Sequence, residues 1–127
     1  MVRPTNHPIQ SYDDFWLFYL REHARPATRT LHYIGTSLAA FGLAAALVLG
    51  NPWLLLAVPI AGYGPAWAAH FFVENNRPAT FTYPLWSLVS DFRMAFRRLT
   101  GRIDHDLRRA GVVEESVEST AGADRRR

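Results

Sequence analysis

The sequence of 127 residues contains no cysteine and no lysine. Without cysteine the chain cannot form a disulfide, a thiolate zinc site, an iron–sulfur cluster or a thiolate nucleophile, so any metal ion must be held by His, Asp or Glu. All 14 basic residues are Arg, which hints at a GC-rich, bacterial genome. These Arg residues are spread along the chain without a nucleic-acid-binding motif, so a nucleic-acid partner is not expected.

Charge is also absent from the middle of the chain, where the 41 residues 33–73 include no Asp, Glu or Arg. A bilayer core is crossed by about 20 apolar helical residues. This run therefore predicts two membrane-spanning helices, at about 31–49 and 53–73, with a joint at 50–52. The alternative is a buried helical pair in a soluble protein, but a chain this short has little else with which to wrap two such helices.

The flanks of the apolar run are rich in Arg, whereas the joint has none. By the positive-inside rule both termini are expected on the cytoplasmic side of the membrane, which would be the inner membrane of a bacterium. The first thirty residues are polar, so a cleaved signal peptide, whose apolar core comes early, is not expected. We expect a single membrane domain over 1–112 and a disordered polar tail over 113–127.

Two amphipathic helices are predicted beside the hairpin, which makes the fold class all-α. The first covers 11–23, begins at Ser11 as N-cap and carries an aromatic stripe suited to the membrane interface. The stripe consists of Tyr12, Phe15, Trp16 and Tyr19. The second covers 85–103, and its apolar residues recur at steps of three and four, as in a basic helix lying on anionic headgroups. It is expected to end near Gly101 or to continue to about Ala110. Pro and Gly at 59–65 predict a kink or a break in the second span.

Three of the five histidines are expected to meet. In an antiparallel hairpin the start of the first span and the end of the second lie at one membrane face, so His32 and His70 share a depth that His23 can also reach. Each alone would be an ordinary interfacial anchor, but ionisable groups gathered at membrane depth are candidates for function. Three imidazoles around an open site suit Fe(II), with Mn or Zn as alternatives. His7 and His105 have solvated surroundings and are left out.

One face of the second span is polar where its neighbours are apolar. Tyr63, Trp67, His70 and Glu74 lie on this face at i, i+4, i+7 and i+11. Glu74 is therefore a candidate fourth ligand, or a partner that orients a ligand. An ion pair with Arg77 at the helix end is the alternative. Tyr63 and Trp67 either line a substrate path or pack against other helices, and packing suits Trp67 better.

A nine-residue sequence occurs twice, as EHARPATRT at 22–30 and as ENNRPATFT at 74–82, with six identical positions. Arg25 and Arg77 suit helix ends, the prolines discourage continuation of the preceding helix, and Thr28 and Thr80 can cap the next helix. The candidate ligands do not repeat with the motif. We therefore interpret it as one turn used twice rather than as a duplicated site.

The segments FWLFYLREH, LHYIGT and GYGPAWAAHFFVENNRPATFTYPLWSLVSDFRM resemble the Mpo1-like proteins, a family once known as DUF962. The likeness covers about 12–94, and its His-x3-Glu-x2-Arg-Pro-Ala-Thr signature is quite specific. A characterised fungal member is an Fe(II)-dependent dioxygenase of the endoplasmic reticulum that shortens 2-hydroxy fatty acids by one carbon. The resemblance implies the same α-oxidation here, with a membrane lipid or fatty acid and O2 as substrates and CO2 as a product.

The resemblance also implies residue roles. The catalytic iron ligands implied in this way are His23, His32 and His70, with Glu74 on the acidic position of the signature. Arg29 or Arg77 could hold the substrate carboxylate, a bidentate role suited to guanidinium. With two spans only, the substrate tunnel must be built differently from that of longer relatives, or by a homo-oligomer. The competing hypotheses are a non-enzymatic membrane protein with His and Arg anchors, and a di-iron desaturase or hydroxylase, which the small number of His disfavours.

Overall fold

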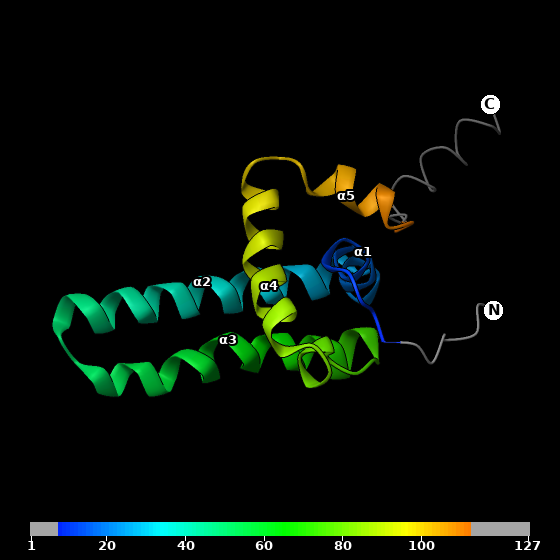
Figure 1. The fold of residues 1–127 in the computed structure, drawn as a ribbon. Coiled ribbons are helices and arrows are strands. Elements are labelled where there is room, and N and C mark those ends of the chain that lie inside the picture. The colour runs from blue at the N-terminus through cyan, green and yellow to red at the C-terminus, as the bar shows by residue number, and fades with distance from the viewer. Residues whose placement is uncertain (1–7, 113–127) are drawn as a thin grey trace, which may run out of the picture.

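The computed structural model describes residues 8–112 (Figure 1). Over this range the chain is helical and contains no strand, which confirms the predicted all-α class. The elements, in chain order, are α1 (Tyr12–Glu22), α2 (Pro26–Leu49), η1 (Pro52–Leu56), α3 (Ala57–Ala68), η2 (Ala69–Glu74), η3 (Ala79–Phe81), α4 (Pro84–Leu99) and α5 (Ile103–Arg109). The predicted tail at 113–127 and His7 lie outside the described residues.

The predicted hairpin is present, and its two arms lie side by side and antiparallel (Figure 1). The first arm is α2; the second is a continuous helix, Pro52–Glu74, built from η1, α3 and η2. Gly50 reverses the chain in the left-handed region, at φ 62°, where a glycine has no Cβ to strain. Asn51 then caps the second arm by accepting a hydrogen bond from the Trp53 N–H. Proline favours the first helical position, so α2 begins at Pro26, five residues before the predicted start of the apolar span.

Small residues let the two arms approach closely. A Cβ at Gly35 would come within 2.5 Å of the Gly62 carbonyl oxygen, so only glycine fits at this crossing. Of the kink or break predicted for the second span, the break is absent, because Pro65 lies inside a helix that stays continuous. The irregularity instead appears in the hydrogen bonding, which widens to a π-helix over Ala69–Glu74. Single π turns of this kind are frequent at functional sites.

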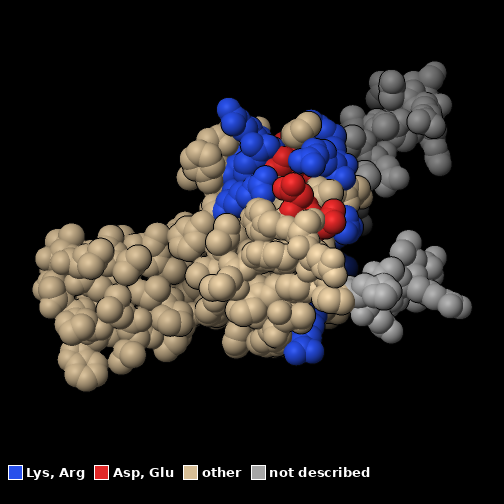
Figure 2. All heavy atoms as spheres, viewed as in Figure 1, with Lys and Arg blue, Asp and Glu red and all other residues tan. Residues whose placement is uncertain are grey.

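The surface of the hairpin is apolar and exposed. Only 17% of the residues in the most apolar window of each arm are buried, although both arms are long and apolar enough to cross a membrane. Among the exposed side chains are Phe41, Leu47, Val48, Leu49, Trp53, Ile60 and Phe72. A soluble protein rarely leaves so large an apolar surface uncovered. Figure 2 shows the turn end of the hairpin without a charged residue, while the charged side chains gather at the opposite end.

The core lies at that charged end, where α1 packs against α4 and α5. Ser11 caps α1 by accepting a hydrogen bond from the Asp14 N–H, as predicted. The aromatic stripe of α1 does not face a membrane interface, however. Phe15, Trp16 and Tyr19 are at most 1% exposed and form the centre of the core. The prediction for the stripe was wrong because amphipathicity shows that a face is buried, not whether protein or lipid covers it.

Helix α4 crosses the hairpin instead of continuing along it (Figure 1). Its apolar face is uncovered, from Leu85 near its start to Leu99 at its end. An exposed apolar face on a helix that runs across the two arms of the hairpin is compatible with the membrane-surface helix that the sequence predicts. Helix α4 ends at Leu99, and α5 follows as a separate helix from Ile103. Between them lies Gly101, whose φ angle is 72°. Ile103, which was expected to continue the apolar face of α4, is instead buried in the core from α5.

Candidate metal centre

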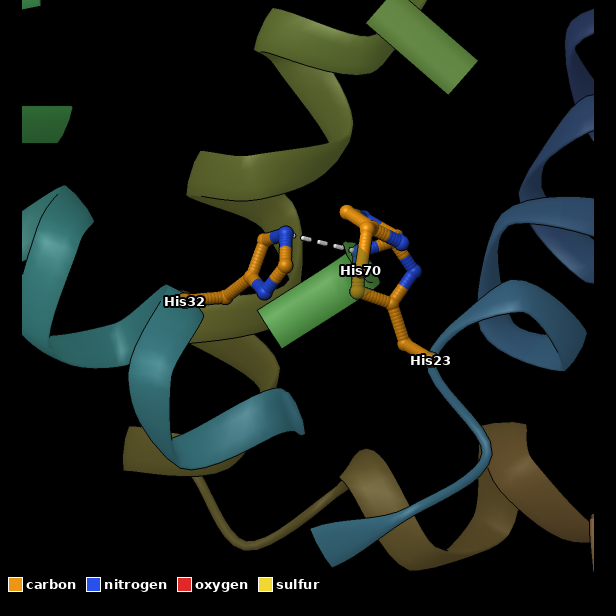
Figure 3. A group of neighbouring side chains, drawn as sticks. All are labelled: His23, His32 and His70. Carbon is orange, nitrogen blue, oxygen red and sulfur yellow. Dashed lines mark hydrogen bonds between the residues drawn. The ribbon is translucent and has the colours of Figure 1, made fainter. Parts of the chain in front are cut away.

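His23, His32 and His70 meet at the charged end of the hairpin (Figure 3). His23 lies in the turn after α1, His32 lies in the second turn of α2, and His70 lies in η2. Their ring centroids are 4.2 to 4.9 Å apart, and each side chain is buried. The sequence prediction that these three would come together is therefore confirmed in geometry.

Each ring is held through its Nδ1 atom by an oxygen that can only accept a hydrogen bond. His23 Nδ1 lies 2.6 Å from the Tyr19 carbonyl oxygen, and His32 Nδ1 lies 2.9 Å from the Thr28 carbonyl oxygen. The third acceptor is the side-chain oxygen of Asn76, 2.7 Å from His70 Nδ1. All three Nδ1 atoms therefore donate, so in the neutral rings the Nε2 atoms keep their lone pairs. Hydrogen bonds of this kind orient histidine ligands in metal sites.

The ring nitrogens of the three histidines lie close together. The Nε2 atoms of His23 and His32 are 2.9 Å apart, and one ring nitrogen from each of the three residues can be chosen so that all lie within 4.8 Å of one another. Two lone pairs at 2.9 Å repel unless a proton or a cation lies between them. If two nitrogen ligands each lie about 2.1 Å from a metal ion and the N–metal–N angle is about 90°, the two nitrogens are about 3 Å apart. The donor set and its geometry therefore fit a metal ion.

Burial also keeps the cluster in the form that binds metal. Burial lowers the pKa of His23 well below its ordinary value, and the neighbouring rings of His32 and His70 lower it further. A histidine with a depressed pKa is neutral at pH 7, and the neutral imidazole is the metal ligand.

Glu74 is not part of the cluster. Its carboxylate accepts a hydrogen bond from the Arg25 N–H at 2.6 Å, at the residue that precedes α2. The residue that orients His70 is Asn76, whose amide N–H group also donates to the main-chain oxygen and to the carboxylate of Glu22. The two copies of the repeated sequence thus clasp each other through hydrogen bonds in both directions. Glu22 of the first copy accepts from Asn76 of the second, and Glu74 of the second copy accepts from the Arg25 N–H of the first.

The prediction that Thr28 and Thr80 cap helices is wrong. Pro26 already starts α2, so Thr28 lies inside the helix, where its carbonyl oxygen accepts the hydrogen bond from His32. Thr80 lies within η3, and α4 begins four residues later without a side-chain cap. Glu74 therefore takes the place next to the start of α2 that the sequence analysis gave to Thr28.

Neither Arg29 nor Arg77 lines the cavity beside the histidines. The buried guanidinium of Arg29 donates to the carbonyl oxygens of His23 and Ala24, which fixes the turn that carries His23. The Arg77 guanidinium is exposed and lies over the ring of Phe81. The structure thus gives Arg29 a part in holding a ligand-bearing turn, and places Arg77 at the surface.

A small cavity, lined by both polar and apolar side chains, adjoins the three histidines. Next to it lies an apolar groove of about 570 Å³ between α2, α3 and α4. Tyr63 and Asp91 line both. The groove has the size of a ligand site and is formed by a single chain. Tyr63 thus lines the cavity beside the cluster, and Trp67 lines it too and also packs against Tyr63 and Phe81.

Asp91 connects to the cluster through Tyr19. The Tyr19 hydroxyl donates to Asp91 Oδ1, and the Tyr19 ring stacks on His23 with centroids 4.0 Å apart. Burial raises the pKa of Asp91 to about 6, and the hydrogen bond from Tyr19 opposes this shift. Asp91 was not predicted as a site residue, although it is the one acidic residue in α4 and lies among the apolar positions of that helix. Asn76 was not predicted either, although it differs from the matching Ala24 of the first copy.

Comparison with known proteins places the chain in a family. A search of the curated proteins and a search of the solved structures found no match. The family model described as "2-hydroxy-palmitic acid dioxygenase Mpo1-like" matches residues 9–103, which include the three histidines, both clasped turns and α4. The chain belongs to the Mpo1-like family.

Proposed function

We propose that the protein is an Fe(II)-dependent dioxygenase that shortens 2-hydroxy fatty acids by one carbon at the membrane. The observation that carries this proposal is the cluster of three buried histidines, each able to offer a ring nitrogen to one metal ion, with an apolar groove next to the cavity that they line. The family to which the chain belongs is described by its action on 2-hydroxy-palmitic acid, which supports the choice of substrate class.

The donor set favours a first-row transition metal. His23, His32 and His70 supply three neutral nitrogens, and no carboxylate among the described residues joins them. Three protein ligands leave positions for exogenous ligands, and imidazole suits Fe, with Zn and Mn as competitors. When bound, Fe(II) would supply the redox chemistry that lets O2 react with the acid.

The overall reaction balances without a further reductant. The acid R–CH(OH)–COOH reacts with O2 to give R–COOH, CO2 and H2O. The bond between C1 and C2 breaks, and the substrate supplies all four electrons that O2 accepts. No 2-oxoglutarate or external electron donor is needed, and the described chain requires no docking site for either.

The groove and the cavity together would hold the substrate in one orientation. An acyl chain in the apolar groove would stay in contact with the bilayer, and its polar head would pass Tyr63 and Asp91 to reach the histidines. The Arg-rich end of the molecule that carries the site faces the cytoplasm under the positive-inside rule, at the inner membrane in a bacterium. Asp91, hydrogen-bonded to Tyr19, lies where it can accept a hydrogen bond from the 2-hydroxyl group.

The test is to purify the protein anaerobically in mild detergent, measure Fe, Mn and Zn per chain, and then add O2 with 2-hydroxypalmitate labelled at C1. We expect near-stoichiometric iron, labelled CO2 and the C15 acid, and no products from palmitate. His105→Ala is the matched control, because His105 lies in α5, outside the cluster. Protein that takes up no metal would favour the non-enzymatic alternative, and metal without products would overturn the substrate class.

A further inference from the structure

Two polar side chains in the cavity beside the histidines have no hydrogen-bond partner among residues 8–112, which the structure describes. They are Ser87 of α4, whose Oγ is buried, and Trp67 of α3, whose Nε1 is buried. Ser87 is only 2% exposed. Buried polar groups are nearly always paired, and one left unpaired destabilises the folded chain, so two in one cavity require an explanation.

The chemistry of the two groups limits what can pair with them. An indole N–H only donates, and a serine hydroxyl can donate, so the missing partner carries acceptor oxygens. The cavity is lined by no Arg. Besides the two unpaired donors, the lining includes the three histidines and Asp91, so a carboxylate held there by Ser87 and Trp67 would lie near the histidine cluster.

We propose that Ser87 and Trp67 bind the carboxylate of the acid substrate, the role that the sequence analysis gave to Arg29 or Arg77. This inference rests on the proposed function. Trp67 and Ser87 come from the two elements, α3 and α4, that also form walls of the apolar groove. A fatty acid whose tail fills the groove therefore brings its head between them.

Neutral donors also suit the chemistry of the head. Hydrogen bonds to a charged acceptor are stronger than neutral ones, so two of them can hold a carboxylate in a fixed orientation. An Arg side chain would form an ion pair with the acid and compete with the cluster for it. Ser87 and Trp67 instead orient the acid without adding a charge to a buried site.

The test is a binding titration without turnover. Protein loaded with Fe(II) is titrated anaerobically in detergent with 2-hydroxypalmitate by calorimetry, and in parallel with hexadecane-1,2-diol, which keeps the tail and the hydroxyl but lacks the carboxylate. We expect Ser87→Ala and Trp67→Phe each to weaken binding of the acid about 10- to 100-fold, the range for a hydrogen bond to a charged group. Diol binding should change less than about threefold.

Two matched controls separate the cavity from general packing. Ser90→Ala removes an equally buried hydroxyl from α4 that is hydrogen-bonded to Tyr12 and lies outside the cavity. Trp16→Phe removes an unpartnered indole N–H from the core. Both should bind the acid as the wild type does. Ser87→Ala should also be at least as thermally stable as the wild type, because it removes an unpaired hydroxyl.

The outcomes distinguish this inference from the proposed function. If the wild type holds iron and binds the acid, but Ser87→Ala and Trp67→Phe bind it equally well, the carboxylate lies elsewhere and only this inference fails. An equal loss for acid and diol would assign the two residues to packing and also overturn it. A wild type that binds neither iron nor the acid overturns the proposed function and this inference with it.

Discussion

The turn at 22–30 and the turn at 74–82 share six of nine residues, yet they contribute to the metal centre in different ways. The first turn carries a candidate ligand, His23, at its second position. The second turn has Asn75 there, and contributes Asn76 at its third position to orient a ligand from the helix before it. The shared residues build the turns, and the unshared residues assign the roles.

The prolines show how the same residue gives different structures in the two turns. Pro26 begins the 24-residue helix α2, whereas Pro78 precedes η3, a single turn of three residues. The cause lies downstream. A residue before proline is kept from the helical region, so Pro84 holds Tyr83, the residue directly after the second copy, out of a helix. After Pro26 in the first copy, no further proline occurs until Pro52.

The largest effect is expected when His23, the second residue of the first turn, is replaced by asparagine, the residue at the same position of the second turn. His23→Asn removes one of three candidate ligands, so we expect near-stoichiometric iron to fall to background. Elemental analysis of anaerobically purified protein measures this, with His105→Ala as the control. Iron that stays bound in His23→Asn would show that the ligands lie elsewhere.

Replacing Asn76, the third residue of the second turn, by the residue at the same position of the first turn should lower the metal affinity without abolishing metal binding. Asn76→Ala copies Ala24 of the first turn and leaves His70 Nδ1 without its acceptor. Loss of such an orienting group lowers metal affinity about 10- to 100-fold. Competition with a chelator measures the affinity, and Asn75→Gly is the control, because Asn75 is exposed and has φ 56°, which glycine adopts freely. Equal affinities for the two variants would contradict this role.

Sequence patterns predicted the hairpin well because a membrane span is set by length and apolarity, which are local properties. They also predicted that His23, His32 and His70 meet, because an antiparallel hairpin fixes which ends lie together. They did not predict the partners of these residues. Asn76 reaches His70 only because a π turn and a left-handed Asn75 bend the chain back, and neither feature has a periodic signal.

The same limit explains why some residues lie elsewhere than expected. The signature made Glu74 a candidate ligand or an orienting partner, and helical spacing placed it on the face of His70. The wider π turn changes that spacing, and the carboxylate reaches the Arg25 N–H instead. The aromatic stripe of α1 was assigned to the membrane because the sequence does not show that α4 and α5 fold back over it.

A pH titration separates the two turns again, since His23 titrates and the matching Asn75 does not. In the folded, metal-free protein the pKa of His23 is depressed by burial. Above about pH 6.5 His23 is unprotonated in both the folded and the unfolded chain. Below this pH the unfolded chain takes up a proton on His23 that the folded chain does not. The contribution of His23 alone should therefore lower the free energy of unfolding by up to about 1.4 kcal/mol per pH unit as the pH drops below about 6.5.

Asp91 contributes with the opposite sign. Its pKa is raised from 3.8 to about 6, so the folded protein takes up the proton first and gains stability as the pH falls through this range. Comparing His23→Asn with the wild type cancels this term. Thermal unfolding of metal-free protein from about pH 8 to about pH 5 should show a shallower loss of stability in the variant, and identical slopes would contradict the assigned shift of His23.

The smallest effect is expected at the first position, where both turns have Glu. Glu74→Ala leaves the Arg25 N–H without its acceptor, which should lower the free energy of unfolding by about 1 kcal/mol. Because Glu74 lies outside the histidine cluster, iron per chain should not change. Glu22→Ala frees the amide of Asn76 and should lower metal affinity through His70, although Glu22 is equally absent from the cluster. Thermal unfolding and metal content of the two variants together decide the roles. Loss of iron in Glu74→Ala would make Glu74 a ligand, as the family signature suggested, and would mean that the clasp opens when metal binds.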